Sequence, residues 1–181
     1  MKWLVLLVSA LAAVLAHADE TVKICHNYGC LTEAAAIYSD RRLAQVHDLL
    51  AAAATPAQER DLVAKAIGQL YAWAAEQTPI GADRGGDYAD DGKAGRMDCI
   101  DHSMTTDRFL HLFARLGWLR FHRVGTIVVR HRWIFGQHFS AVLEDRQSGK
   151  RYVVDTWFRD NGRPAVVMSL ADWYAGGGPN D

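Results

Sequence analysis

The chain has 181 residues, a formal net charge of −1 at pH 7 and 50% hydrophobic residues. This length is typical of one domain, and the apolar fraction is sufficient for a packed core. A chain so close to neutrality provides no large basic field for binding phosphate backbones, which excludes nucleic acid as an expected partner.

Residues 1–18 have the features of a cleaved signal peptide. Lys2 precedes a short apolar run from Leu4 to Leu15, and Ala16-His17-Ala18 places small residues where a signal peptidase reads them. The run is shorter than the about 20 residues that cross a bilayer. Cleavage would leave residues 19–181 as a single domain, exported to the periplasm or secreted and without a membrane span. An uncleaved anchor is the alternative.

The chain contains three cysteines. Cys25 and Cys30 lie close together in the sequence, and in an oxidising compartment this spacing predicts a small disulfide loop. A metal or haem site is the alternative, although haem attachment uses C-x-x-C-H, which is absent at these positions. Their pairing would leave Cys99 as an odd thiol, which is either buried and inert or reactive.

Two helices are predicted in the N-terminal half, after a short edge strand at 21–24. Ser39 is a suitable N-cap, and apolar residues follow it at helical spacing. In the next helix Thr55 can cap, Pro56 suits the first turn and Gln58 completes a capping box. Its periodic apolar face consists of Leu62, Ala66, Leu70 and Trp73.

Residues 78–98 interrupt this pattern with a long loop, and loops of this length are often functional. It contains aspartates at 83, 87, 90 and 91. A calcium site is an alternative, although these residues do not follow the D-x-[DN]-x-[DN]-G pattern and acidic loop residues are usually solvated. We expect the loop, with Tyr88, to form a wall of a substrate cleft beside Cys99.

The C-terminal half is predicted as one more helix followed by strands. Asp98 can cap the helix and Gly117 can end it. Strands are expected at about 119–130, 134–145, 151–158 and 163–168, with an Asn161-Gly162 turn before the last and a short closing helix at 169–174. Helices followed by an antiparallel sheet predict an α+β fold.

Cys99, His138 and Asp155 are the candidate catalytic residues, on a helix start and two strands. The partial positive charge of a helix N-terminus favours a thiolate, His138 can accept and return the thiol proton, and Asp155 can orient the imidazole. Because carboxylates oppose a thiolate, Asp98 and Asp101 should point away from Cys99 or be neutralised.

Three segments carry a resemblance: residues 95–101 (GRMDCID), 137–142 (QHFSAV) and 152–158 (YVVDTWF). Through them the chain resembles the transglutaminase-like and papain-like cysteine enzymes, most closely the bacterial transglutaminase-like cysteine proteinases of the cell envelope. The resemblance implies a Cys99-His138-Asp155 triad, a helix-borne cysteine packed on an antiparallel sheet, and hydrolysis or acyl transfer at an amide without a metal or other cofactor. The implied partner is a peptide or protein substrate, and a cell-envelope protein is one candidate. Papain-like enzymes also place a glutamine before the cysteine; the nearest here is Gln77, beyond the loop, so the oxyanion partner stays unassigned.

Two alternatives remain open at this point. Cys99 and His102 have the C-x-x-H spacing of a zinc ligand pair, which His138 or Asp155 could complete. The fold could instead serve as a catalytically silent binding module. Trp157 and Trp133 are expected to flank the cleft, and His102 to lie in the cleft or on the helix surface. Thiol reactivity of Cys99 discriminates an enzyme from a module.

Overall fold

The computed structural model describes residues 18–87, 91–132 and 136–179, which form an α+β fold. The strands are β1 (Glu20–His26), β2 (Thr32–Tyr38), β3 (His122–Arg132), β4 (Gly136–Asp145), β5 (Arg151–Asp155) and β6 (Val166–Ser169). The helices are α1 (Asp40–Ala51), α2 (Pro56–Ala75), α3 (Cys99–Arg115) and α4 (Leu170–Tyr174), with a 3-10 helix, η1 (Pro79–Ala82). The α+β prediction is confirmed.

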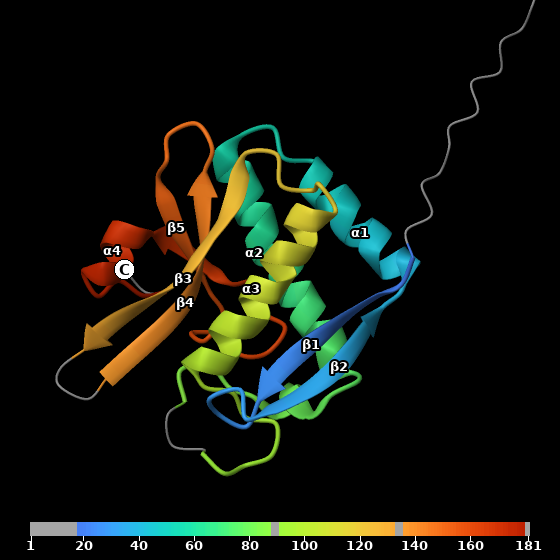
Figure 1. Ribbon diagram of the computed structural model, residues 1–181, viewed down its shortest axis with the longest axis vertical. Helices are drawn as coiled ribbons and strands as arrows, with labels where there is room; N and C mark the ends of the chain where they lie inside the picture. The colour runs from blue at the N-terminus through green and yellow to red at the C-terminus, as the bar shows by residue number, and fades with distance from the viewer. Residues whose placement is uncertain (1–17, 88–90, 133–135, 180–181) are drawn as a thin grey trace, which may run out of the picture.

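The strands form two antiparallel sheets. β1 and β2 make a two-stranded hairpin, and the other sheet has the order β3-β4-β5-β6. Helix α3 lies between them: it contacts β3, β4 and β5 on one side and β1 on the other (Figure 1). Phe109, Leu110 and Phe113 of α3 are fully buried in the core. The helix that begins at Cys99 is therefore the central element of the domain.

The predicted helix caps are present. Side chains of Ser39, Thr55 and Asp98 accept hydrogen bonds from the first turns of α1, α2 and α3. Gln58 departs from the predicted capping box, because its Oε1 accepts from the N–H of Ala54 rather than from that of Thr55. Gly117 follows α3 with φ +74°, the left-handed conformation expected after a helix end.

Strand β2 was not predicted from the sequence. Its alanine-rich sequence, Thr32–Tyr38, has low strand propensity, but Ala36 and Tyr38 face the core while Ile37 between them is exposed. Pairing with β1, which was predicted, and a disulfide across the turn hold it in place. Tertiary pairing therefore outweighs local propensity here.

The four predicted strands of the C-terminal half are present but shorter, and β3 and β6 end two residues and one residue later than expected. The strand expected to reach 158 ends at Asp155, where the Trp157 N–H turns back to donate to Asp155 Oδ1 at 3.2 Å. The described residues contain no helix that is long and apolar enough to cross a membrane. The predicted signal peptide lies almost entirely in residues 1–17, outside the described residues, and stays a prediction.

Candidate active site

Cys99 is the first residue of α3. The Asp98 side chain accepts from the N–H of Asp101, and the Asp101 side chain accepts from the N–H of Asp98, so the helix begins with a reciprocal capping box around the thiol. Cys99 is 9% exposed. Asp98 thus caps the helix as predicted, and Asp101 completes the capping box.

His138 and Asp155 lie on the adjacent strands β4 and β5 and are joined by a hydrogen bond of 2.7 Å between Nε2 and Oδ2. Both are buried. Because the carboxylate can only accept, the imidazole carries its proton on Nε2. Asp155 is fixed by two further donors, the Trp157 N–H on Oδ1 at 3.2 Å and Trp173 Nε1 on Oδ2 at 3.1 Å.

The second nitrogen of His138, Nδ1, is buried and has no hydrogen-bond partner among the described residues. Aromatic rings surround the imidazole: the centroid distances are 4.9 Å to Trp157, 5.3 Å to Phe158 and 5.6 Å to Trp173. With Nε2 held by Asp155, the lone pair of a neutral ring lies on Nδ1, which is therefore available to accept a proton.

The Cys99 sulfur lies against the backbone that carries His138. Sγ is 3.7 Å from the carbonyl oxygen of Gln137, to which the thiol donates. Burial raises the pKa of Cys99 to about 11; the N–H of Phe139 lowers it, whereas the charges of Asp98 and Asp155 raise it further. Burial and the two carboxylates therefore oppose the thiolate that the start of the helix was expected to favour.

A cleft of about 610 Å³ opens at Cys99. Its walls come from α3, β3, β4 and three loops: Tyr28, Asp87, Asp98, Cys99, Ile100, His131, Gly136, Gln137, Phe139 and Trp157. Asp87 belongs to the long loop that was expected to border the cleft, and Trp157 was expected to flank it. A larger cavity of about 740 Å³ lies beside β6 and does not include Cys99.

His102 was expected in the cleft or on the helix surface, and the structure contradicts this. It is 3% exposed; Nε2 lies 3.0 Å from Asp83 Oδ2 and Nδ1 lies 2.9 Å from Thr156 Oγ1. Asp83 also accepts the N–H of Met97 and is buried, so it is not a solvated loop carboxylate. The pair ties the long loop to α3 and to the residue after Asp155.

These contacts bear on the zinc site that was considered for Cys99 and His102. Both of its ring nitrogens are occupied by Asp83 and Thr156, so neither is available to share a zinc ion with Cys99. Within the described ranges, three potential metal-ligating atoms gather at Cys25, Cys30 and Asp101, and two of these are the sulfurs of a disulfide. Asp83, the first aspartate of the calcium alternative, is engaged by His102 and Met97.

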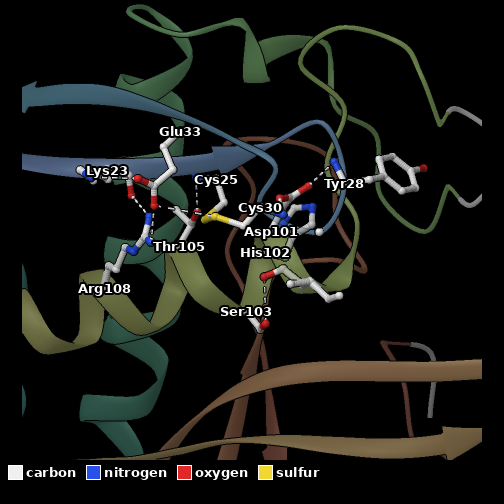
Figure 2. The surroundings of a disulfide bond; sticks show 12 residues. Lys23, Cys25, Tyr28, Cys30, Glu33, Asp101, His102, Ser103, Thr105 and Arg108 are labelled. Carbon is white, nitrogen blue, oxygen red and sulfur yellow. Dashed lines mark hydrogen bonds and ion pairs between the residues drawn. A yellow bond between two sulfur atoms is a disulfide. The ribbon is translucent and has the colours of Figure 1, made fainter.

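The predicted Cys25–Cys30 disulfide is present and closes the β1–β2 turn, with a Cα–Cα distance of 4.7 Å. Figure 2 shows the Asp101 carboxylate beside it, directed toward the backbone of the turn. Burial, with the charge of Asp98, raises the pKa of Asp101 to about 6, although backbone N–H groups oppose the shift.

Some site residues were not found from the sequence. Tyr28 and His131 line the cleft, and Trp173 holds Asp155 from the closing helix. No local pattern marks Tyr28 or His131, and the predicted closing helix gave no sign that its Trp173 would contact Asp155. Trp133 and Tyr88, predicted to bind substrate, lie outside the described residues.

Gln77, the nearest glutamine before the cysteine, has a structural role. Its amide accepts from the N–H of Ile37 and donates to the carbonyls of Ile37 and Trp73, which fixes β2 to the end of α2. It is not available as an oxyanion donor.

Comparison of the chain with protein-family models, with curated proteins and with solved structures finds no match.

Proposed function

We propose that the protein is an exported cysteine enzyme that cleaves or transfers an acyl group at an amide bond of a peptide or protein. Cys99 is the nucleophile, His138 the general base and acid, and Asp155 the residue that orients the imidazole. The observation that carries the proposal is the 2.7 Å His138–Asp155 bond, which leaves Nδ1 unpartnered on the strand whose backbone contacts the Cys99 sulfur.

The resting form in this mechanism has a neutral thiol and a neutral imidazole, because burial and nearby carboxylates raise the pKa of Cys99 to about 11. The thiol proton passes to His138 Nδ1 as sulfur attacks the carbonyl carbon of the substrate. Asp155 then stabilises the imidazolium. Collapse of the tetrahedral intermediate gives a thioester, and the imidazolium donates its proton to the leaving amine.

The open end of α3 supplies the donors for the developing oxyanion. The first N–H groups of a helix lack intrahelical partners. The capping box uses the N–H of Asp101, which leaves those of Cys99 and Ile100 beside the cleft. Donors placed where charge develops stabilise the transition state of acyl transfer. They take the role for which Gln77 is unavailable.

The cleft walls support a peptide-sized substrate. Tyr28, Phe139 and Trp157 offer apolar surface next to the thiol, and Gln137 offers backbone polar groups. Either water or an amine can accept the acyl group from the thioester. The Cys25–Cys30 disulfide supports a site of action in an oxidising compartment, outside the cytoplasm.

The test is labelling by a peptide-like probe with a thiol-reactive acyl warhead, followed by peptide mapping and turnover assays on amide libraries. We expect labelling at Cys99, and loss of both labelling and turnover in Cys99→Ala and His138→Ala. The matched control is His47→Ala, because His47 is a half-exposed histidine of α1 that pairs with Asp48, contacts Trp118 and does not line the cleft. Turnover retained by Cys99→Ala would remove the nucleophile, and an unlabelled native Cys99 would favour the silent module.

A further inference from the structure

The turn closed by the disulfide has an unusual backbone. Asn27, Tyr28, Gly29 and Cys30 have φ values of 66°, 67°, 64° and 54°, so four successive residues lie in the left-handed region. Residues other than glycine enter this region at a steric cost and rarely in succession. A turn of this kind persists only where its surroundings hold it.

The surroundings are the two carboxylates that flank the nucleophile. The N–H groups of Tyr28 and Cys30 donate to Asp101 at 2.8 and 2.7 Å, and that of Gly29 donates to Asp98 at 3.0 Å. Three successive N–H groups of the turn therefore converge on the cap of α3, one residue before and two residues after Cys99.

The turn also contacts the cleft and the segment leading to it. Tyr28 is a wall of the cleft, while Asn27 donates its N–H to the Arg96 carbonyl and accepts from the N–H of Gly95. In Figure 2 the Tyr28 ring points away from the disulfide. The Cys25–Cys30 disulfide thus closes a turn that contacts both the start of α3 and the cleft at Cys99.

We infer that the Cys25–Cys30 turn is a redox-dependent clamp that positions Cys99 and Tyr28, so that the enzyme works only with this disulfide formed and Cys99 reduced. The inference rests on the proposed function for its effect on turnover. It makes Asp101 a positioning residue that acts through the start of α3. A dithiol reductant, of the kind that maintains exported proteins, would then switch the enzyme off.

The chemistry of release is ordinary thiol–disulfide exchange. A thiolate of the dithiol attacks Sγ of Cys30, which is half-buried, and Cys25 leaves and takes a proton. The second thiol of the reductant then displaces Cys30. The reductant becomes a disulfide, and the protein gains two electrons and two protons.

The clamp is tested on the full protein with two readouts taken before and after treatment with dithiothreitol. The first is turnover of the best amide substrate. The second is the pH dependence of Cys99 alkylation by iodoacetamide, read by peptide mapping. Cys25→Ser/Cys30→Ser provides the permanently open form, and Lys23→Gln, an exposed change on the same hairpin, provides the control.

We expect the two readouts to move in opposite directions. Opening the turn frays the start of α3, so turnover falls about tenfold or more. The thiol meanwhile becomes solvated, its pKa moves from about 11 toward about 8.5, and alkylation at pH 8 becomes about tenfold faster or more. If the disulfide merely stabilised the fold, its reduction would lower the melting temperature without moving the pH midpoint of Cys99 alkylation.

Unchanged alkylation and turnover in verified reduced protein would overturn the inference, as would complete unfolding on reduction, which would make the disulfide a global staple. Asp101→Asn keeps the disulfide but cannot accept both N–H groups of the turn. In that variant reduction should add less than half of its native effect on alkylation, because the two perturbations share one route. A full effect there refutes the clamp. If native protein shows no turnover at all, the proposed function fails and the alkylation arm decides the clamp alone.

Discussion

Replacing Asp155 by asparagine separates the two effects that this carboxylate has on the site. Oδ2 accepts from His138 Nε2 and Trp173 Nε1, whereas Oδ1 accepts from the Trp157 N–H. An asparagine therefore places its oxygen at the Oδ2 position, where two donors are satisfied, and its NH₂ opposite one backbone N–H. His138 keeps its proton on Nε2 and loses only the negative charge of its partner.

The expected loss of activity follows from this orientation of the asparagine amide. A hydrogen bond to a charged group contributes about 1.5–3 kcal/mol, which corresponds to a decrease in kcat/KM of about 10- to 150-fold. Loss of the productive tautomer, as in the corresponding serine-protease variant, costs about 10⁴-fold. We expect about 10²-fold in Asp155→Asn, because the Trp173 donor selects the orientation that preserves the tautomer.

The same substitution acts on Cys99 with the opposite sign. The Asp155 charge contributes to the raised pKa of the thiol, so its removal lowers the alkylation midpoint from about 11 and makes alkylation at pH 8 faster. The assay is a pair of pH profiles, for turnover and for iodoacetamide labelling. Asp48→Asn, 82% exposed on α1, controls for a distant loss of charge. A 10⁴-fold loss of turnover with an unmoved midpoint would refute this reasoning.

Three predictions concern the scaffold, each measured by urea denaturation. Glu59 is fully buried and accepts hydrogen bonds from His122 Nδ1 and from the N–H groups of Arg120, Phe121 and His122. Glu59→Ala should therefore lower the free energy of unfolding by about 3–5 kcal/mol. The control Glu76→Gln, at a surface ion pair with Arg42, should lower it by under about 1 kcal/mol. Burial raises the pKa of Glu59, but the hydrogen bonds from His122, Arg120 and Phe121 bring that pKa below its ordinary value in the folded protein. The stabilisation from Glu59 is therefore complete above about pH 4.5 and is lost as the pH falls through the lowered pKa of the folded state. The Glu59→Ala variant should lack this pH dependence. Gly68→Ala should destabilise the protein by about 1–3 kcal/mol despite the better helix propensity of alanine, because the new Cβ would lie 2.6 Å from the Arg163 carbonyl oxygen. A gain in stability would contradict the packing of α2 on the loop between β5 and β6.

The parts of the fold that were predictable are those in which local chemistry and tertiary structure agree. Ser39, Thr55 and Asp98 cap helices because their side chains satisfy N–H groups that would otherwise lack partners, and this requirement is local. Strand β2 was not predictable on that basis, because its Ala-rich residues become a strand only through pairing with β1. Its alternation over Ala36, Ile37 and Tyr38 was the available signal.

The site divides in the same way. Cys99, His138 and Asp155 could be named from residue type and order, and the structure brings the second and third into contact. Trp173 and Tyr28 could not be assigned, because their places depend on how α4 and the disulfide turn pack around the cleft. His102 was misread because a histidine three residues after a helix start gives no sign that Asp83, from the loop, is buried against it.

The surroundings of Cys99 determine when its thiol can ionise. Asp98 and Asp155 both oppose a thiolate, and burial opposes it more strongly, so Cys99 rests as a neutral thiol. A neutral thiol is a poor nucleophile toward oxidants and toward other disulfides. The raised pKa therefore slows oxidation of Cys99 at neutral pH and its exchange with the Cys25–Cys30 disulfide. In the proposed mechanism His138 takes the proton as the substrate carbonyl arrives, so the nucleophile forms only when the cleft is occupied.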